Sequence, residues 1–349
     1  MWIALASFFA ASTKLSFIKL SQYTHILAIT VLIAAMATSE DRVRRLLYAV
    51  ATAVGLLGAK GALDYVLTGG QYRMQGPGGL MTEENEYALA LNMAIPILFL
   101  LAGTEPRRWA RWALRLGGVG CAITVIGTHS RSGFLGLATA ALLVTMYSRR
   151  KVIGVVALAL AGVLFIFVAP KAAMQRYETI NSEALDSDAS VIGRLQAWET
   201  ALYMVKAHPL LGVGPMNFES QFSHYSAYHP RAPHNAYIAL AAESGIPSAL
   251  LFVGFLLGTI RQMWFLWFRL RRVPGAQRLA SFCLAVHSSL IVYMVPNFFI
   301  NRQNQDLMYH MIGIAAGLAV LAQRRIAAER RQHFEPAIEE QAVLEPVNA

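Results

Sequence analysis

The residues best suited to chemistry are a histidine and its neighbours at the start of a long apolar segment. His234 and Asn235 precede an apolar run that begins at Ala236. A helix that starts there would attract anions through its free N–H groups and its dipole. A histidine at this position would lie beside a bound phosphate and could move a proton near neutral pH. From spacing alone, a capping or interfacial histidine is the alternative.

Two arginines could bind the same anion. Arg131 lies in the turn 128–133 between two apolar segments, with no carboxylate beside it in the sequence, and Arg194 lies in a polar stretch. A guanidinium group matches phosphate through two parallel hydrogen bonds, which a lysine cannot do. A single arginine near a membrane can instead anchor in lipid headgroups, so each arginine alone is a weak signal.

Arg194 lies on a predicted amphipathic helix. Apolar residues recur there with the spacing 4-3-4-3, which predicts one apolar stripe on a helix of about fifteen residues: Val191, Leu195, Trp198, Leu202 and Val205. Pro209 follows and ends the helix. The stripe places Arg194 at the edge of the buried face, at the level of the lipid headgroups.

Membrane-spanning helices must position these residues. Apolar residues make up 56% of the chain and charged residues only 14%, whereas about 25% charged is usual in soluble domains. Nine segments are apolar enough to span a bilayer, although the shorter ones need flanking residues to reach across: 23–37, 46–67, 87–103, 109–128, 133–148, 152–169, 236–260, 279–299 and 307–322. Residues 2–11 are apolar too and correspond to about half of a tenth span. The sequence therefore predicts an all-α polytopic membrane protein with about 9–10 transmembrane helices.

The same pattern divides the chain into four parts. Residues 1–169 hold the first transmembrane helices, and their abrupt start predicts that further spans precede them. Residues 170–235 form one large periplasmic loop that contains amphipathic helices. Residues 236–326 hold the last transmembrane helices. Residues 327–349 are polar and acidic, which predicts a disordered cytoplasmic tail.

The net charge of +10 reflects orientation in the membrane. If the large loop lies outside, five short inner loops collect eighteen of the thirty lysines and arginines. This positive-inside bias predicts that the large loop, with any active site on it, lies on the outer side of the membrane. Binding to nucleic acid is not needed to explain the charge, and membrane lipids are the expected surroundings.

Other polar groups in the apolar regions have structural alternatives. Lys60 and Asp64 stand four residues apart, so they would face each other on one helix, either as an ion pair or lining a cavity. The cysteines, Cys121 and Cys283, both fall in predicted spans and predict no disulfide framework. The histidines at 224, 229 and 234 do not have the usual spacing of metal ligands, which predicts no metal site.

Several of these motifs together resemble the O-antigen ligase and polymerase superfamily. Nine residues separate His234-Asn235 from Gly245, as in the signature of that family, and Ser248 stands where Gly, Thr or Tyr is usual. The runs 193–198 and 208–214 are similar to its large periplasmic loop, and 128–131 is similar to its Ser-Arg turn.

One branch of the superfamily resembles the chain more closely, namely the O-glycosylation ligases found with exosortase A systems. The similar motifs are Gly-Ala-Lys-Gly at 58–61, Thr-Gly-Gly-Gln-Tyr-Arg at 68–73, and Glu-Glu-Asn at 83–85 before Ala-Leu-Ala-Leu at 88–91. Members of the branch tend to have Asp-Asn-Asn at the position of 83–85. The resemblance covers about residues 45–322.

The resemblance implies an enzyme of the bacterial inner membrane whose active site faces the periplasm. It would transfer a glycan from an undecaprenyl-diphosphate carrier to a hydroxyl of a protein or lipid acceptor. Arg131 and Arg194 would hold the diphosphate, and His234 would activate the acceptor or contact the leaving group. Five further residues are expected to bind substrate: Asn235, Lys60, Arg73, Tyr72 and Asn85. The carrier already stores the activation energy, so no metal or other cofactor is expected.

Three alternative functions stay open. A polymerase of the same superfamily would add repeat units to a growing chain, and the sequence separates it poorly from a ligase. A transporter of lipid-linked sugars or ions would tend to carry internal repeats and paired broken helices, which the sequence does not show. A membrane partner without catalytic activity is the third.

Overall fold

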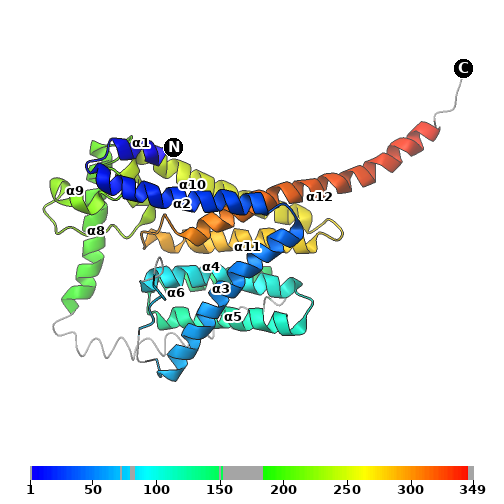
Figure 1. Ribbon diagram of the computed structural model, residues 1–349, viewed down its shortest axis with the longest axis horizontal. Helices are drawn as coiled ribbons and strands as arrows, with labels where there is room; N and C mark the ends of the chain where they lie inside the picture. The colour runs from blue at the N-terminus through cyan, green and yellow to red at the C-terminus, as the bar shows by residue number, and fades with distance from the viewer. Residues whose placement is uncertain (1, 71–72, 79–82, 149–150, 152–183, 345–349) are drawn as a thin grey trace, which may run out of the picture.

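The protein is built from helices. The computed structural model describes residues 2–70, 73–78, 83–148, 151 and 184–344. The helices in these ranges are α1 (Trp2–Phe8), α2 (Thr13–Met36), α3 (Glu40–Leu67), α4 (Glu84–Thr104), α5 (Arg108–Gly127), α6 (Arg131–Tyr147), α8 (Ala184–Ala207), α9 (Phe218–Tyr225), α10 (Ala236–Leu270), α11 (Gln277–Met294), η1 (Pro296–Phe298) and α12 (Asp306–Leu344) (Figure 1).

Six of the described helices are long and apolar enough to cross a membrane, namely α2, α3, α4, α10, α11 together with η1, and α12 as far as Arg331. Helix α6 is apolar but shorter. The prediction of an all-α polytopic membrane protein is therefore confirmed. Eight of the nine predicted spans coincide with α2–α6 and α10–α12, and the predicted span 152–169 lies outside the described residues.

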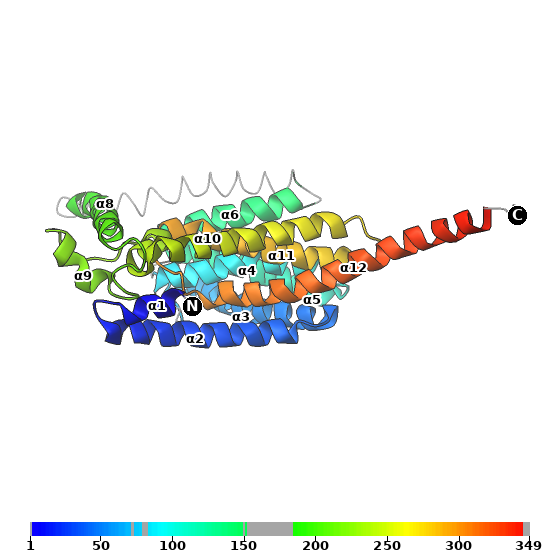
Figure 2. The same cartoon turned by 90° about the horizontal axis from the view of Figure 1, so that it is seen from above.

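The bundle has two groups of helices. Helices α4, α5 and α6 pack together, with α3 running obliquely against α4 and α5 (Figure 1). Helices α10, α11 and α12 form the second group, and α2 packs along α12 (Figure 2). The contact between α4 and α11 joins the two groups. Fully buried side chains such as Leu91, Met93 and Phe282 belong to the single core that results.

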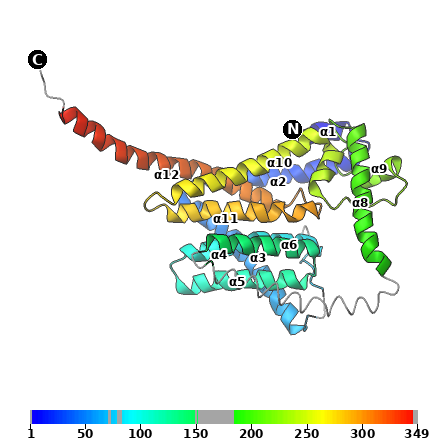
Figure 3. The ribbon, with the colours of Figure 1, turned by 180° about the vertical axis from the view of Figure 1, so that it is seen from behind.

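Helix α8 lies across one end of the bundle and runs crosswise to the long helices (Figure 3). We call this end, at which α4, α6, α10 and α12 begin, the α8 end. Helix α8 is longer than the stripe predicted from Val191 to Val205, and it packs on α10. A small separate core holds α8, α9 and the turn between them against α10: Ala197, Ala201, Met204, Val213, Phe218, Phe222 and Ala242.

A glycine kink in α10 receives the turn that follows α8. Gly245 has a φ of +84°, a conformation that other residues rarely adopt. A Cβ atom there would collide with the Leu210 carbonyl, so the turn can approach only a glycine. The backbone of Ile246 donates a hydrogen bond to Pro209 (2.8 Å), and that of Val213 donates to Ala242 (2.9 Å). The close approach at Gly245 thereby fixes the first part of α10 to the turn that follows α8.

The arginine-rich loops meet at the opposite end of the bundle. Arg44 on α3 forms a salt bridge with Glu105, which caps α4 (2.7 Å). Arg278 on α11 contacts Glu40 at the start of α3. The helix bounds therefore place the described loops that were predicted to be on the inner side at one end of the bundle, away from α8.

The C-terminal segment differs from the sequence prediction. Helix α12 continues to Leu344 and projects from the bundle (Figures 1 and 2), whereas a disordered tail was predicted from residue 327. Residues 327–344 are rich in Ala, Glu, Arg and Gln, which favour helix more than most residues do. The acidic, polar composition therefore did not prevent a continuous helix.

Candidate functional site

His234 is held at the start of α10 by its neighbour. The Asn235 side chain accepts hydrogen bonds from the backbone N–H groups of Tyr237 (3.0 Å) and Ile238 (3.1 Å), as a helix N-cap does. Asn235 is only 4% exposed. His234 has a φ of +44°, so the backbone turns sharply just before the cap. Asn235, which was predicted to bind substrate, thus uses its side-chain oxygen within the protein.

Helix α8 contacts the residues just before His234. The Trp198 indole donates a hydrogen bond to the Pro233 carbonyl (2.7 Å). Arg194 lies four residues before Trp198, so both side chains project from the same face of α8. The Arg231 guanidinium lies against Gly193, where a larger residue would collide with it. The face of α8 that carries Arg194 therefore faces the loop that ends in His234.

Arg131 is positioned by a small cluster of hydroxyls at the start of α6. Ser130 is the N-cap, and its side chain accepts a hydrogen bond from the Gly133 backbone (2.9 Å). The hydroxyls on either side of Arg131, those of Ser130 and Ser132, donate to Asn85 Oδ1 (2.6 and 3.2 Å). Asn85 on α4, also predicted to bind substrate, thus fixes the turn that carries Arg131.

Arg131, Arg194 and His234 lie within electrostatic reach of one another. Burial, and then the positive charge of Arg131, lower the pKa of Arg194. Partial withdrawal from water, and then the Arg194 guanidinium, lower the pKa of His234, while Glu83 and Glu219 act weakly in the opposite direction. Three segments far apart in the chain therefore converge at the α8 end.

The three groups suit an anion and a proton transfer. In the described part of the chain neither Arg131 nor Arg194 forms a salt bridge, and the charge of Arg131 acts on Arg194. A bound diphosphate would relieve this repulsion through charge-assisted hydrogen bonds. The lowered pKa keeps His234 neutral at pH 7, so its ring can accept a proton.

An apolar groove adjoins this cluster. Its volume is about 490 Å³, and its wall is formed by residues from α8, the start of α10 and the end of α11 with η1: Trp198, Asn235, Tyr237, Ile238, Val295, Phe298 and Phe299. Trp198 and Asn235 belong both to the groove and to the supports of Arg194 and His234. An apolar chain attached to a phosphate could therefore occupy the groove while its phosphate lies at the arginines.

The other predicted binding residues lie in different settings. Arg73 is near the α6 turn, since it donates to the Thr128 carbonyl (3.2 Å), but Glu84 neutralises it in a salt bridge (2.7 Å). Lys60 is exposed on α3, and among the described residues it forms no salt bridge, with Asp64 or any other carboxylate. Tyr72 lies outside the described residues.

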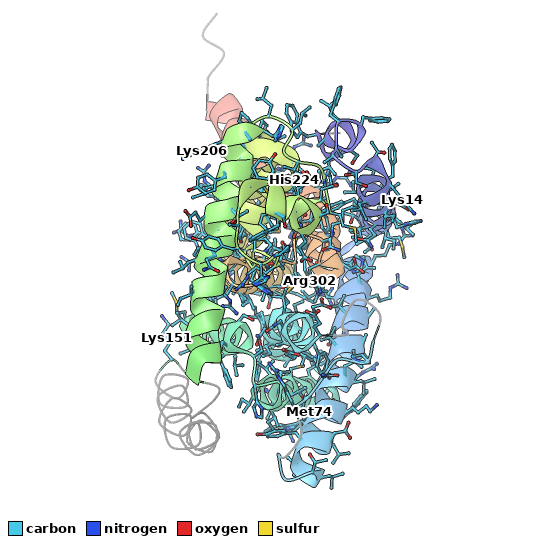
Figure 4. All side chains as sticks on the ribbon, turned by 90° about the vertical axis from the view of Figure 1, so that its left-hand side faces the viewer. Lys14, Met74, Lys151, Lys206, His224 and Arg302 are labelled. Carbon is cyan, nitrogen blue, oxygen red and sulfur yellow. The ribbon has the colours of Figure 1, made fainter. Side chains whose placement is uncertain are left out.

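A charged group that the sequence reasoning missed lies beside the cluster. Arg302, in the loop between η1 and α12, contacts Glu86 on α4 and lies 3.8 Å from Glu83. Figure 4, which views the α8 end, shows Arg302 between the two groups of helices. Glu83 also acts on the pKa of His234, so Arg302 and His234 share a charged neighbour. A run of six polar residues, 301–306, was the available signal.

Residues 116–253 match the O-antigen ligase family model. The matched region contains Arg131, Arg194, His234 and the glycine kink at Gly245. It covers less than half of the chain, and it supports a likeness to the O-antigen ligase superfamily and to a glycosyltransferase-like enzyme. Among curated proteins, none matches the chain.

Proposed function

We propose that this protein is a membrane glycan ligase that transfers a glycan from a polyprenyl-diphosphate carrier to a hydroxyl group of an acceptor. The observation that carries the proposal is the convergence of Arg131, Arg194 and His234 beside an apolar groove. The arginines suit the diphosphate, and the groove suits the first isoprene units of the carrier. The family match over residues 116–253 supports the same activity.

In this reaction the acceptor oxygen attacks the anomeric carbon of the first sugar. The bond between that carbon and the diphosphate oxygen breaks, and the diphosphate leaves with the bonding electrons. Arg131 and Arg194 stabilise the negative charge that develops on the leaving group. The acceptor hydroxyl loses its proton to the neutral His234 ring as it attacks, and a positioned base of this kind contributes about 10²–10⁴-fold.

The distribution of arginines supports a periplasmic site. The arginine-rich loops lie at the end opposite α8, and such loops stay in the cytoplasm. With this orientation the α8 end and the cluster face the periplasm of a bacterial inner membrane. A carrier-linked glycan displayed on the outer leaflet could then bring its diphosphate to headgroup level beside α8.

The finer assignment follows the motifs at 58–61, 68–73 and 83–85. They support the O-glycosylation ligases associated with exosortase A, with undecaprenyl diphosphate as the carrier and a protein or lipid as the acceptor. The hydrogen bonds of Asn85 with Ser130 and Ser132 support a positioning role for the third motif, since they fix the turn of Arg131.

Alanine substitutions at the cluster test this function. We expect His234→Ala, Arg131→Ala and Arg194→Ala each to lower glycan transfer by about 100-fold or more, because each removes either the base or a charge on the leaving group. The assay measures transferred glycan in membranes that contain the full chain and carrier-linked glycan. Lys206→Ala is the matched control, since it removes an exposed positive charge from α8, the helix that carries Arg194.

Normal product from all three cluster variants, at normal protein levels, would show that the site is elsewhere. The product also separates a ligase from a polymerase. A ligase releases the glycan from the carrier onto an acceptor, whereas a polymerase leaves a lengthened glycan on the carrier.

A further inference from the structure

The loop between η1 and α12 holds a group of buried side-chain oxygens without donors. Among the described residues, four atoms of this loop are buried and accept no hydrogen bond: Asn301 Oδ1, Gln303 Oε1, Asn304 Oδ1 and Asp306 Oδ1. Gln303 is 3% exposed and Asn304 is 8% exposed. Buried acceptors without donors cost free energy, so their concentration in one turn requires an explanation.

The backbone of the same loop is well anchored. The Tyr293 hydroxyl donates to the Arg302 carbonyl (2.9 Å), and the Arg302 N–H donates to Asn297 Oδ1 (3.2 Å). The Tyr309 hydroxyl donates to the Gln303 carbonyl (3.2 Å). The turn is therefore fixed by its main chain, while its side-chain oxygens stay available. Such an arrangement is typical of a binding site that is formed before its ligand arrives.

The charges around the loop favour a neutral, hydroxyl-bearing ligand over a metal ion. Oxygen atoms of amides and carboxylates can bind Mg²⁺ or Ca²⁺, but Arg302 lies among them and would repel a cation. Its guanidinium is engaged with Glu86 on α4 and with Glu83, the residue just before that helix. The unpartnered oxygens require O–H or N–H donors, and a saccharide brings several hydroxyls close together.

The loop also lies next to the proposed reaction centre. Glu83 is 3.8 Å from Arg302, and its charge acts on His234. Val295, Phe298 and Phe299, which precede the loop in the chain, line the apolar groove. A glycan whose diphosphate lies at Arg131 and Arg194 would therefore have its sugars within reach of residues 301–306.

We propose that residues 301–306 bind hydroxyl groups of the carrier-linked glycan and so select the donor by its sugars. This inference rests on the proposed function, because it takes the diphosphate to lie at the arginine cluster. The side-chain oxygens of Asn301, Gln303 and Asn304 accept hydrogen bonds from the sugar hydroxyls. Asp306, at the start of α12, supplies a further acceptor.

Binding measurements with two carriers test the proposal. One ligand is bare undecaprenyl diphosphate, and the other is the same carrier with the glycan extracted from the source organism. The full chain is placed in lipid nanodiscs. We expect Asn304→Leu and Asn301→Ala to weaken binding of the glycan-bearing carrier about tenfold and to leave binding of the bare carrier unchanged.

Two further variants control for folding and for the diphosphate site. Asn304→Asp keeps side-chain oxygens at the buried position, so we expect it to retain binding of the glycan-bearing carrier. Asn301 is only half-buried, so its alanine variant is expected to fold even if the change at Asn304 is disruptive. Arg131→Gln should weaken binding of both carriers, because both contain the diphosphate.

Each result then bears on one proposal. If wild type binds the glycan-bearing carrier no more tightly than the bare carrier, or if the loop variants weaken both equally, the sugar site is refuted. Slower transfer with normal donor binding also refutes it and points to the acceptor. If wild type fails to bind bare carrier while the loop variants still weaken the glycan-bearing one, the diphosphate site is wrong and the sugar site stands.

Discussion

Substitution of Asn235 separates a structural role from substrate binding. The sequence predicted that Asn235 binds substrate, whereas its side-chain oxygen caps α10 through Tyr237 and Ile238. Asn235→Ala would remove the acceptor and leave two helix N–H groups without partners in a buried position. Asn235→Ser is the matched control, because serine caps helices about as well as asparagine and lacks the amide nitrogen.

The size of the effect follows from these two hydrogen bonds. Loss of an N-cap costs about 1 kcal/mol, and about 2 kcal/mol in the strongest cases. For a chain of this length we expect the melting temperature of Asn235→Ala to fall by about 2 °C. The start of α10 would also hold His234 less firmly, so transfer should fall by about fivefold for 1 kcal/mol of lost positioning. Asn235→Ser should match wild type in both respects.

The measurements are thermal unfolding of the purified protein in detergent and glycan transfer in membranes. A serine variant that is as stable as wild type but inactive would show that the amide nitrogen binds substrate, as the sequence predicted. An alanine variant with unchanged stability would refute the capping argument. If stability and activity fall in Asn235→Ala but not in Asn235→Ser, the result supports a positioning role for Asn235.

Three further predictions concern the pH profile, the packing and the orientation. Burial and Arg194 lower the pKa of His234, and the Glu83 charge partly offsets them. Glu83→Gln should therefore lower this pKa further and move the acid limb of the pH–rate profile to lower pH. An acid limb that stays in place or moves to higher pH argues against His234 as the base. Gly58→Ala should lower the free energy of unfolding by about 1–3 kcal/mol, since its Cβ would lie 2.8 Å from backbone atoms of α5. Gly254→Ala is the control, because a Cβ there meets open space, and it should not lower the melting temperature. A cysteine at Tyr228, exposed at the α8 end, should react with impermeant maleimide from the periplasm; labelling only from the cytoplasm inverts the orientation.

The supports of the cluster could not be predicted from the sequence. Asn85 and Asn235 were predicted to bind substrate, whereas their side-chain oxygens form hydrogen bonds within the protein. From sequence alone, an asparagine that binds a ligand beside a phosphate site cannot be distinguished from one that caps a helix there. Only the positions of neighbouring N–H and hydroxyl groups decide between these roles, and for Asn85 the hydroxyls come from another helix.

The sequence also failed to identify Arg302. A polar run between two spans predicts a loop, and its composition does not reveal which helix it faces. Glu86 on α4 is the contact partner of Arg302, more than two hundred residues earlier in the chain. Similarly, the glycine at 245 was noticed as part of a motif, but its close contact with Leu210 explains why glycine is required.

The sequence by itself determined the helical membrane architecture, the grouping of arginines at one end and the start of a long helix just after His234 and Asn235. These features are local, because the length of an apolar segment and the residues at a helix end decide them through solvation and backbone hydrogen bonding. Tertiary structure decided that Arg131 acts electrostatically on Arg194 and Arg194 on His234, and that an apolar groove adjoins the supports of Arg194 and His234. Such contacts depend on how helices pack against one another, and side-chain shape and close approach set this packing between residues far apart in the chain.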